Sequence, residues 1–478
     1  MKWISVSILA LFLLQFSLPA QDGMGFGSTD ISQDFPCLSD EQRRNIKARL
    51  QTKIDSLLSI DKIQPGTQQT QPLLEWPVVP APGVTDPDIY AISFYVDQEP
   101  TFPGQLLDFF CGNRTYDLTN GYNHSGIDMF NWPFRWYKMD NDLVHVVAAA
   151  PGTIIFKQDG NFDRNCSFGN GSWNAVYLRH RDGSVTWYAH LKNGSLTEKA
   201  VGDVVTAGEF LGVVGSSGNS SGPHLHFETY DAGDNLIDPF AGSCNTLNSE
   251  SWWLEQRPYY NSGINKLMTH SAPPVFPPCP QQEILNEKNH FIQGEVVYTA
   301  AYYRDQLNGQ NSEYKVLQPD GSVYIQWPHS SDADHFNSSY WYWWWNLPEN
   351  ASTGIWTFQV TYESEIYEHQ FSVGPTNIEP ATAAIPRDFE LQQNFPNPFN
   401  PTTTIEYAVK STSSISIKIY NSLGQQVSVL LNSVSTPGSY SLQWDGRDDS
   451  GNLLPGGVYY YRMTGGDFAK TRAMTLLK

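Results

Sequence analysis

The sequence is short of basic residues. Its 29 Lys and Arg stand against 49 Asp and Glu, which gives the 478-residue chain a formal net charge of −20. Binding to a phosphate backbone requires a basic patch that overcomes this charge, and no such patch is visible in the sequence. We therefore expect no nucleic acid partner, and the acidity by itself indicates no particular substrate.

Cysteine is also scarce, and no two cysteines form a CxxC pair. This spacing argues against a zinc site built from thiolates. In an exported chain one or two disulfides are the usual arrangement, but the sequence does not reveal their pairing, and five is an odd number. The five are Cys37, Cys111, Cys166, Cys244 and Cys279.

Long apolar runs are missing after the N-terminus. The one such run, Ile4 to Leu18, is short for a membrane span, follows a single Lys and ends just before the small residue Ala20. This pattern is typical of a secretory signal peptide, which we expect at residues 1–20. We expect the mature chain to have no transmembrane segment and to be secreted or held at the cell surface.

The residues that are abundant favour a mainly β protein. The chain has 25 Tyr, 25 Phe and 15 Trp, with 37 Gly and 31 Pro to form turns. Strand-like runs divided by Gly, Asn and Asp predict an antiparallel β-sheet core domain and then two immunoglobulin-like β-sandwiches. The core is expected at 86–270, the first sandwich at 283–374 and the second at 389–478, with Pro-containing linkers between them.

Residues 21–85 form a helical segment that resembles a propeptide. Ser39 and Gln42 have the spacing of a capping box, and the apolar residues that follow lie on one face of a helix. The helix either packs on the core domain or belongs to a propeptide that blocks a site until it is removed. The apolar residues are Ile46, Leu50, Ile54 and Leu57.

Two aromatic runs each allow two interpretations. The run YWYWWW, Tyr340 to Trp345, is either a platform on which carbohydrate stacks or a strand whose alternate rings fill the core of the sandwich. The run MFNWPFRWYKM at residues 129–139 either lines a cleft or only packs.

The stretch GPHLHFE carries the main chemical signal. His224 and His226 stand at positions i and i+2 of a predicted strand, so both side chains point to one face. Upstream, His124 and Asp128 lie in HSGID, and His190 ends a strand-like run in YAHL. Each residue alone is weak evidence, but together they resemble a metal-dependent active site.

Catalytic zinc requires three nitrogen or oxygen ligands and an open position for water. His124, Asp128 and one histidine of the HxH pair supply such a set. The other histidine of the pair and His190 remain free to move protons and to stabilise an oxyanion.

The order HxGxD, YAHL and VGSSGNSSGPHLHFE resembles the lysostaphin-type zinc metallopeptidases, which cut peptide bonds in peptidoglycan. By position, the resemblance implies one Zn²⁺ per chain, held by His124, Asp128 and His226. It implies that His190 and His224 are the catalytic pair. No motif position is substituted, which matters because the family also contains degenerate regulators without metal.

The C-terminal block, with NFPNPFNPTT and DGRDDSGNLLPGGVYYYRM, resembles the sorting domains of the type IX secretion route. The resemblance implies that the type IX secretion machinery is a partner and that the chain passes through the periplasm and the outer membrane.

These motifs predict a secreted zinc metalloendopeptidase that uses a metal-activated water to cut peptidoglycan stems or cross-bridges. Two alternatives stay open. The first is a non-catalytic cell-surface binding or regulatory protein that uses the peptidase fold and the sandwiches for recognition. The second is a peptidase that acts on Gly-rich proteins.

Deleting residues 389–478 is expected to leave the peptidase activity of the purified protein nearly unchanged, because no residue of the predicted site lies beyond His226. In the native cell the truncated protein should stop in the periplasm. Fractionation of cells that express each form, with activity assayed in every fraction, tests both statements. Normal surface delivery would refute the sorting role, and lost activity would refute the separation of roles.

Overall fold

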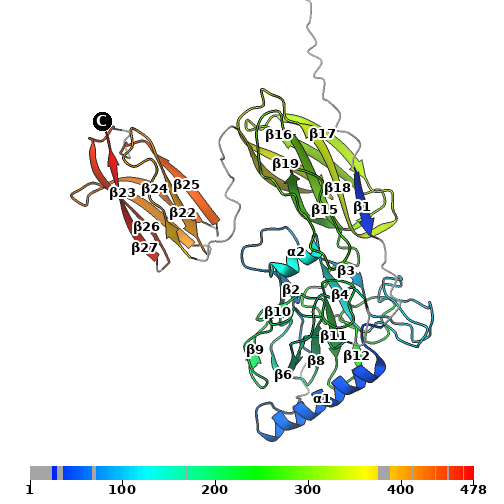
Figure 1. Cartoon of the computed structure of the whole chain (residues 1–478). Helices are drawn as coiled ribbons and strands as arrows, with labels where there is room; N and C mark the ends of the chain where they lie inside the picture. Colours follow the sequence, from blue (N-terminus) through cyan, green and yellow to red (C-terminus); the bar gives the residue numbers. More distant parts are fainter. Residues whose placement is uncertain are drawn as a thin grey trace, which may run out of the picture. The chain divides into compact units, whose positions relative to one another are not determined.

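A computed structural model describes residues 24–28, 36–66, 71–167, 171–374, 388–410, 413–435, 438–448, 452–466 and 468–477. The expected signal peptide and nearly all of the linker at 375–388 lie outside these residues. Across the described residues the chain has two helices and 27 strands (Figure 1). The prediction of a mainly β protein is therefore confirmed. The chain divides into two compact units, and each is described by itself.

The unit that carries the predicted site contains an eight-stranded antiparallel sheet in the order β3-β4-β11-β8-β7-β6-β9, with β12 paired to β11, and a three-stranded sheet, β10-β5-β2. All residues of β11 are buried, which indicates that both faces of the sheet are covered at its centre. The strands are β2 (Val78–Pro80), β3 (Tyr90–Phe94), β4 (Ile127–Asn131), β5 (Val144–Val147), β6 (Gly152–Gln158), β7 (Ala175–Arg179), β8 (Val185–Ala189), β9 (Val204–Val205), β10 (Phe210–Val213), β11 (His224–Tyr230) and β12 (Leu236–Ile237).

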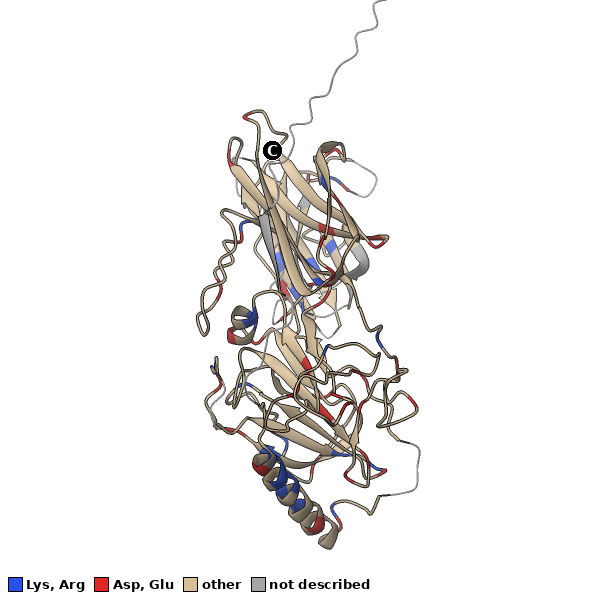
Figure 2. Ribbon diagram, turned by 90° about the vertical axis from the view of Figure 1, so that its right-hand side faces the viewer, with Lys and Arg blue, Asp and Glu red and all other residues tan. Residues whose placement is uncertain are grey.

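Helix α1 (Asp40–Ser59) is the predicted amphipathic helix, and the capping box between Ser39 and Gln42 is present. Leu50 and Leu57 are buried in one core with sheet residues such as Trp187 and Tyr230. Lys, Arg, Asp and Glu residues gather along the helix (Figure 2). The helix is therefore a packed part of the domain, as the first of the two interpretations predicts.

The run at residues 129–139 packs rather than lining an open cleft. It contains the end of β4 and the short helix α2 (Arg135–Asp140). Its large apolar side chains are buried, namely Met129, Phe130, Trp132, Phe134, Trp136 and Met139.

Two disulfides close long loops in this unit, and one or two were expected. Cys111 pairs with Cys244 across 133 residues, and Cys166 pairs with Cys279 across 113 residues. The fifth cysteine, Cys37, is buried and unpaired.

The other unit is a two-sheet sandwich. One sheet has the order β1-β18-β15-β13 and the other β14-β20-β19-β16-β17, and an aromatic-rich core lies between them. The strands are β1 (Met24–Ser28), β13 (Gly263–His270), β14 (His290–Phe291), β15 (Val296–Leu307), β16 (Asn311–Leu317), β17 (Val323–Ser330), β18 (His335–Asn346), β19 (Gly354–Tyr362) and β20 (Glu365–Val373).

The first sandwich is larger than the sequence predicts. β13 pairs with β15, so residues 263–270 belong to the sandwich and not to the end of the 86–270 block. β1, from the 21–85 segment, pairs with β18 at the edge of the same sheet. In the YWYWWW run of β18, Trp343 and Trp345 are buried in the core, whereas Tyr340, Tyr342 and Trp344 are half-buried on the other face.

The C-terminal residues form a second, smaller sandwich with sheets β21-β22-β25 and β24-β23-β26-β27. Its core includes Ile405, Ile417 and Tyr461. The strands are β21 (Glu390–Leu391), β22 (Thr403–Val409), β23 (Ser413–Tyr420), β24 (Gln426–Ser435), β25 (Gly438–Trp444), β26 (Gly457–Gly465) and β27 (Phe468–Leu476).

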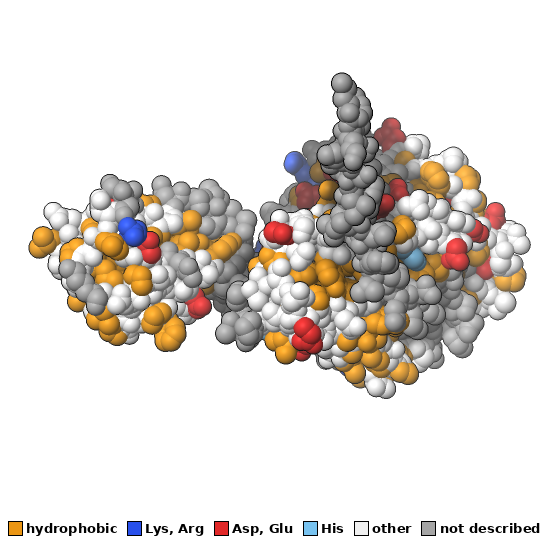
Figure 3. Space-filling model, turned by 90° about the horizontal axis from the view of Figure 1, so that it is seen from above, with side chains coloured by type: hydrophobic (Ala, Val, Ile, Leu, Met, Phe, Trp, Pro, Cys, Tyr) orange, Lys and Arg blue, Asp and Glu red, His pale blue; other side chains and the backbone are white. Residues whose placement is uncertain are grey.

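Figure 3 shows hydrophobic side chains at many places on this face, with some Asp and Glu side chains and few Lys and Arg side chains. Neither of the described helices combines the length and the apolar character that crossing a membrane requires.

Replacing Leu50 or Leu57 by Ala is expected to lower the free energy of unfolding by about 2–5 kcal/mol, the usual cost of truncating a buried Leu. Urea unfolding followed by tryptophan fluorescence measures the change. As a control, Ile60→Ala removes apolar atoms from a side chain that is 62% exposed and should change stability by less than about 0.5 kcal/mol. Equal, small effects in all three variants would show that α1 is not part of the core.

Candidate metal centre

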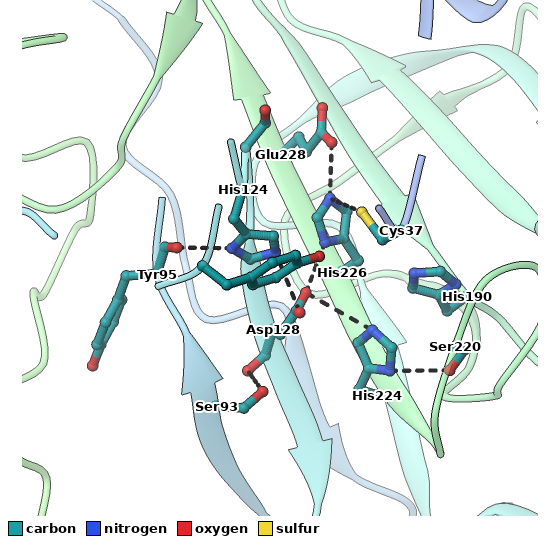
Figure 4. Close-up of polar contacts among 12 residues, drawn as sticks. Cys37, Ser93, Tyr95, His124, Asp128, His190, Ser220, His224, His226 and Glu228 are labelled. Carbon is teal, nitrogen blue, oxygen red and sulfur yellow. Dashed lines mark hydrogen bonds and ion pairs between the residues drawn. The ribbon is translucent and has the colours of Figure 1, made fainter. Parts of the chain in front are cut away.

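Strand pairing brings the predicted residues together from distant parts of the chain. β4 and β11 are adjacent and antiparallel, in a register that places His226 opposite Asp128. β8 lies on the other side of β11 and ends one residue before His190. His224 and His226 share one face of β11, as the HxH spacing predicts. All five predicted residues therefore lie in one buried cluster (Figure 4).

His124, Asp128 and His226 form a compact set of possible ligands. Each offers one atom that lies within 4.8 Å of the other two. Nδ1 of His226 is 2.7 Å from Oδ1 of Asp128, and Nε2 of His124 is 3.2 Å from Oδ2 of the same carboxylate. The three side chains are at most 3% exposed.

His124 is oriented so that one ring nitrogen is available to a metal. Its Nδ1–H donates to the backbone carbonyl of Tyr95 at 2.8 Å, and a carbonyl can only accept. Nε2 is fully buried and has no hydrogen-bond partner among the described residues, because its contact with Asp128 is not aligned as a hydrogen bond. An unsatisfied, buried nitrogen is costly unless something else binds it.

His226 is oriented by a carboxylate that the sequence analysis missed. Glu228 Oε1 lies 2.8 Å from Nε2 of His226, which leaves Nδ1 facing Asp128. The other oxygen of Glu228 pairs with Arg43 of α1 at 2.5 Å. A carboxylate behind a metal-binding histidine selects its tautomer and raises its basicity. The available signal was spacing, since Glu228 follows His226 by two residues and so shares its face.

The charges around the site suit a cation. Burial alone raises the pKa of Asp128, but His124, His224 and His226 outweigh it and hold that pKa well below its usual range. Burial opposes a charge on His226, yet Cys37 and Asp128 raise its pKa well above the usual value. Without metal, a proton on His226 therefore balances the nearby carboxylates. A metal ion at Nδ1 would take the place of that proton.

This set of donors fits zinc. Two imidazole nitrogens and one carboxylate oxygen, each held by a further hydrogen bond or ion pair, match the ligand sets of catalytic zinc sites.

Gly126, the glycine in HSGID, lies so close to His226 that no side chain would fit there. A Cβ on Gly126 would lie 2.6 Å from Cε1 of His226, so a side chain there would push the ring out of place.

His190 and His224 lie beside the possible ligands with their rings 4.4 Å apart. Nδ1–H of His190 donates to the carbonyl of Ser217 at 2.6 Å, and Nδ1–H of His224 donates to that of Gly222 at 2.8 Å. Burial lowers the pKa of both imidazoles. Both rings are therefore neutral near pH 7, with Nε2 able to accept a proton.

His190 has two further features of a functional residue. Its backbone adopts φ 63°, an uncommon conformation for a residue with a side chain. Its Nε2 is buried and without a hydrogen-bond partner within the described ranges. Strain and unsatisfied polar atoms of this kind persist at functional sites.

The histidines outside the motifs behave differently. Both ring nitrogens of His180 are occupied, by the carbonyl of Pro151 at 2.8 Å and by Thr186 Oγ1 at 3.0 Å. His145 packs edge-on against Phe210. These contacts indicate structural roles for both residues.

The structure thus defines a mainly β protein with a buried His₂Asp cluster beside two neutral histidines. Residues 123–239 match the family model of peptidase family M23, and residues 400–467 match that of the FlgD Ig-like domain. These two parts of the chain thus resemble an M23 peptidase domain and, after it, a FlgD Ig-like domain. All five predicted site residues lie within the first match.

Curated relatives resemble a short part of this chain. The DD-carboxypeptidase/endopeptidase Mpg of Neisseria meningitidis is 46% identical over 83 residues, which is 17% of this chain and 16% of Mpg. The glycyl-glycine endopeptidase ALE-1 of Staphylococcus capitis is 34% identical over 110 residues, 23% of this chain and 25% of ALE-1. The chain thus spans a quarter or less of the length of these relatives.

Among solved structures, the catalytic domain of lysostaphin from Staphylococcus simulans is similar at 26% identity. The match covers 31% of this chain and 89% of that domain, with a TM-score of 0.20.

The purified chain is expected to bind one zinc ion, and His226→Ala or Asp128→Ala should abolish binding. Glu228→Gln should keep the fold but weaken affinity by about 10- to 100-fold, because the ring of His226 loses its orienting carboxylate. Metal analysis after dialysis and competition with a chelator measure both effects. Glu198→Gln, the same change at an exposed position, is the control. Stoichiometric zinc in both variants would contradict the assignment of His226 and Asp128 as zinc ligands.

Proposed function

We propose that this chain is a zinc metalloendopeptidase that hydrolyses peptide bonds in peptidoglycan stems or cross-bridges. His124, Asp128 and His226 would hold a single zinc ion, and His190 and His224 would be the catalytic residues. The observation that supports the proposal is the convergence of these five side chains in one buried cluster, in which His124, Asp128 and His226 bring three possible ligand atoms within 4.8 Å of one another.

The bound zinc would supply Lewis acidity, which lowers the pKa of a water to ~7 and polarises a carbonyl. The two catalytic histidines would then transfer protons. Their Nδ1 atoms are committed to backbone carbonyls, so Nε2 of His190 or His224 accepts the proton of the attacking water. The protonated ring stabilises the oxyanion of the tetrahedral intermediate and gives the proton to the leaving amine. Because the rings are buried, bulk water does not compete for these steps.

The names of the relatives support the substrate class. ALE-1 is described as a glycyl-glycine endopeptidase and Mpg as a DD-carboxypeptidase/endopeptidase. We infer that this chain cuts a peptide bond formed by Gly or D-Ala.

The sequence motifs support an export route as well. We infer that residues 1–20 are a signal peptide and that residues 389–478 direct the chain to the type IX secretion machinery, so that the peptidase acts outside the cell or at its surface. The basis is the resemblance of NFPNPFNPTT and the module after it to known sorting domains.

Purified chain should cleave peptidoglycan, and mass spectrometry of digests from several wall chemotypes should identify one type of peptide bond. His190→Ala and His224→Ala should keep their zinc and lose turnover by ~10²-fold or more, the usual contribution of a general acid or base. His145→Ala, the same change outside the cluster, should keep normal turnover.

Elastin-like protein, incubated in parallel, separates the alternatives. Cleavage of this protein without cleavage of peptidoglycan would support a peptidase of Gly-rich proteins. A folded, zinc-loaded chain that cuts neither substrate would support a binding role.

A further inference from the structure

Arg135, the first residue of α2, is a half-buried cation without an anionic partner. Burial lowers the pKa of its guanidinium to about 10, so the group stays charged near pH 7. Among the described residues, the guanidinium forms no ion pair and no hydrogen bond. The charge of Glu283 favours it, but that carboxylate accepts hydrogen bonds from the backbone N–H groups of Trp136 at 3.1 Å and Tyr137 at 2.9 Å. A cation in this position is costly unless an anion joins it.

The guanidinium lies on the face of the sheet that carries the proposed zinc ligands. Its Cζ is 3.9 Å from the centre of the Phe130 ring. Phe130 follows Asp128 by two residues in β4, so both side chains point to the same face. Phe130 is also paired with His224 across β4 and β11. Arg135 therefore lies beside a proposed catalytic histidine and not on the far side of the sheet.

Two neighbours hold this side chain in place. The Phe130 ring supports the guanidinium through a cation–π contact. Gly222 also lies beside it, because a Cβ on Gly222 would be 3.8 Å from Nη1 of Arg135. The carbonyl of Gly222 is the acceptor that orients His224. Burial lowers the pKa of His224, and the charge of Arg135 adds to this effect, so the cation is close to the proposed proton acceptor.

We propose that Arg135 determines specificity by binding a free carboxylate of the substrate peptide. The inference rests on the proposed peptidase function and adds a feature of its substrate. A guanidinium offers two parallel N–H donors that match the two oxygens of a carboxylate, and an amide cannot accept them in the same way. The bound carboxylate supplies the anion that Arg135 lacks.

The register of the strands sets how far this carboxylate lies from the scissile bond. The Phe130–His224 pair is two residues along the strands from the Asp128–His226 pair. Two residues of a strand span about 7 Å, and an extended substrate covers that distance in about two residues. The carboxylate therefore belongs to the cleaved residue or its near neighbours, and it is either the C-terminal carboxylate of the peptide or one on a side chain.

Muropeptides released by a muramidase test the proposal, used before and after their carboxylates are converted to amides with carbodiimide and ammonia. The zinc-loaded chain should cleave the free form with kcat/KM about 10- to 100-fold higher than the amidated form, as expected for charge-assisted hydrogen bonds. Arg135→Gln should lose this preference, mainly through a higher KM for the free form. Arg135→Lys, which keeps the charge but not the paired donors, should retain part of it. Arg44→Gln, the same change at an exposed position of α1, should retain all of it.

Synthetic copies of the cleaved peptide identify which carboxylate Arg135 binds. One copy is amidated only at the C-terminus and the other only on the side chain. One of the two should reproduce the loss seen with full amidation, and unchanged cleavage of both copies would overturn the proposal. Zinc content and near-ultraviolet circular dichroism show whether each variant is folded.

Calorimetric titration of the zinc-loaded His190→Ala variant with both muropeptide preparations measures binding with little turnover. The free form should bind about 10-fold or more tightly than the amidated form, and adding Arg135→Gln should abolish the difference. Cleavage without preference for the free form, or an equal loss on both forms in Arg135→Gln, would overturn the role of Arg135 and leave the peptidase proposal intact. Binding that depends on Arg135, without cleavage by the wild-type chain, would overturn the peptidase proposal and leave the carboxylate site intact.

Discussion

The hydrogen bond between His226 and Glu228 is the interaction on which the rest of the site depends. It commits Nε2 of the ring and so leaves Nδ1 facing Asp128 across the β4–β11 pair. Glu228 can remain charged in a fully buried position because Arg43 of α1 pairs with its other oxygen. A helix at the start of the chain therefore helps to set the tautomer of a proposed metal ligand.

This dependence makes α1 a structural part of the unit that carries the site. α1 contributes apolar side chains to the core and a cation to Glu228, so its removal would leave a buried charge without its partner. Removing one partner of a buried pair costs about 3–5 kcal/mol in general. Cys37, just before α1, is buried in the same core. A truncation that removes α1 would therefore disturb the site as well as the fold.

The four histidines of the site are oriented in the same way. In each, one nitrogen bonds to a fixed acceptor and the other faces the cluster. The acceptors are the carbonyls of Tyr95, Ser217 and Gly222 and the carboxylate of Glu228. The acceptors are neutral carbonyls for three of the histidines and a carboxylate for His226. Burial lowers the pKa of His190 and His224, whose carbonyl partners are neutral, whereas Cys37 and Asp128 raise the pKa of His226 against the effect of burial.

The sequence by itself determined the mainly β class, the capping box of α1, and the five residues that meet at the centre. These features depend on local spacing, such as the i and i+2 positions of HxH, or on residue types that one chemistry requires. Only the tertiary structure decided which partners lie behind them. Glu228 with Arg43, Cys37 beside His226, and β13 in the sandwich all depend on which distant segments pair and dock. Such contacts join residues far apart in the chain, and their choice follows from the burial of whole faces, which no local pattern encodes.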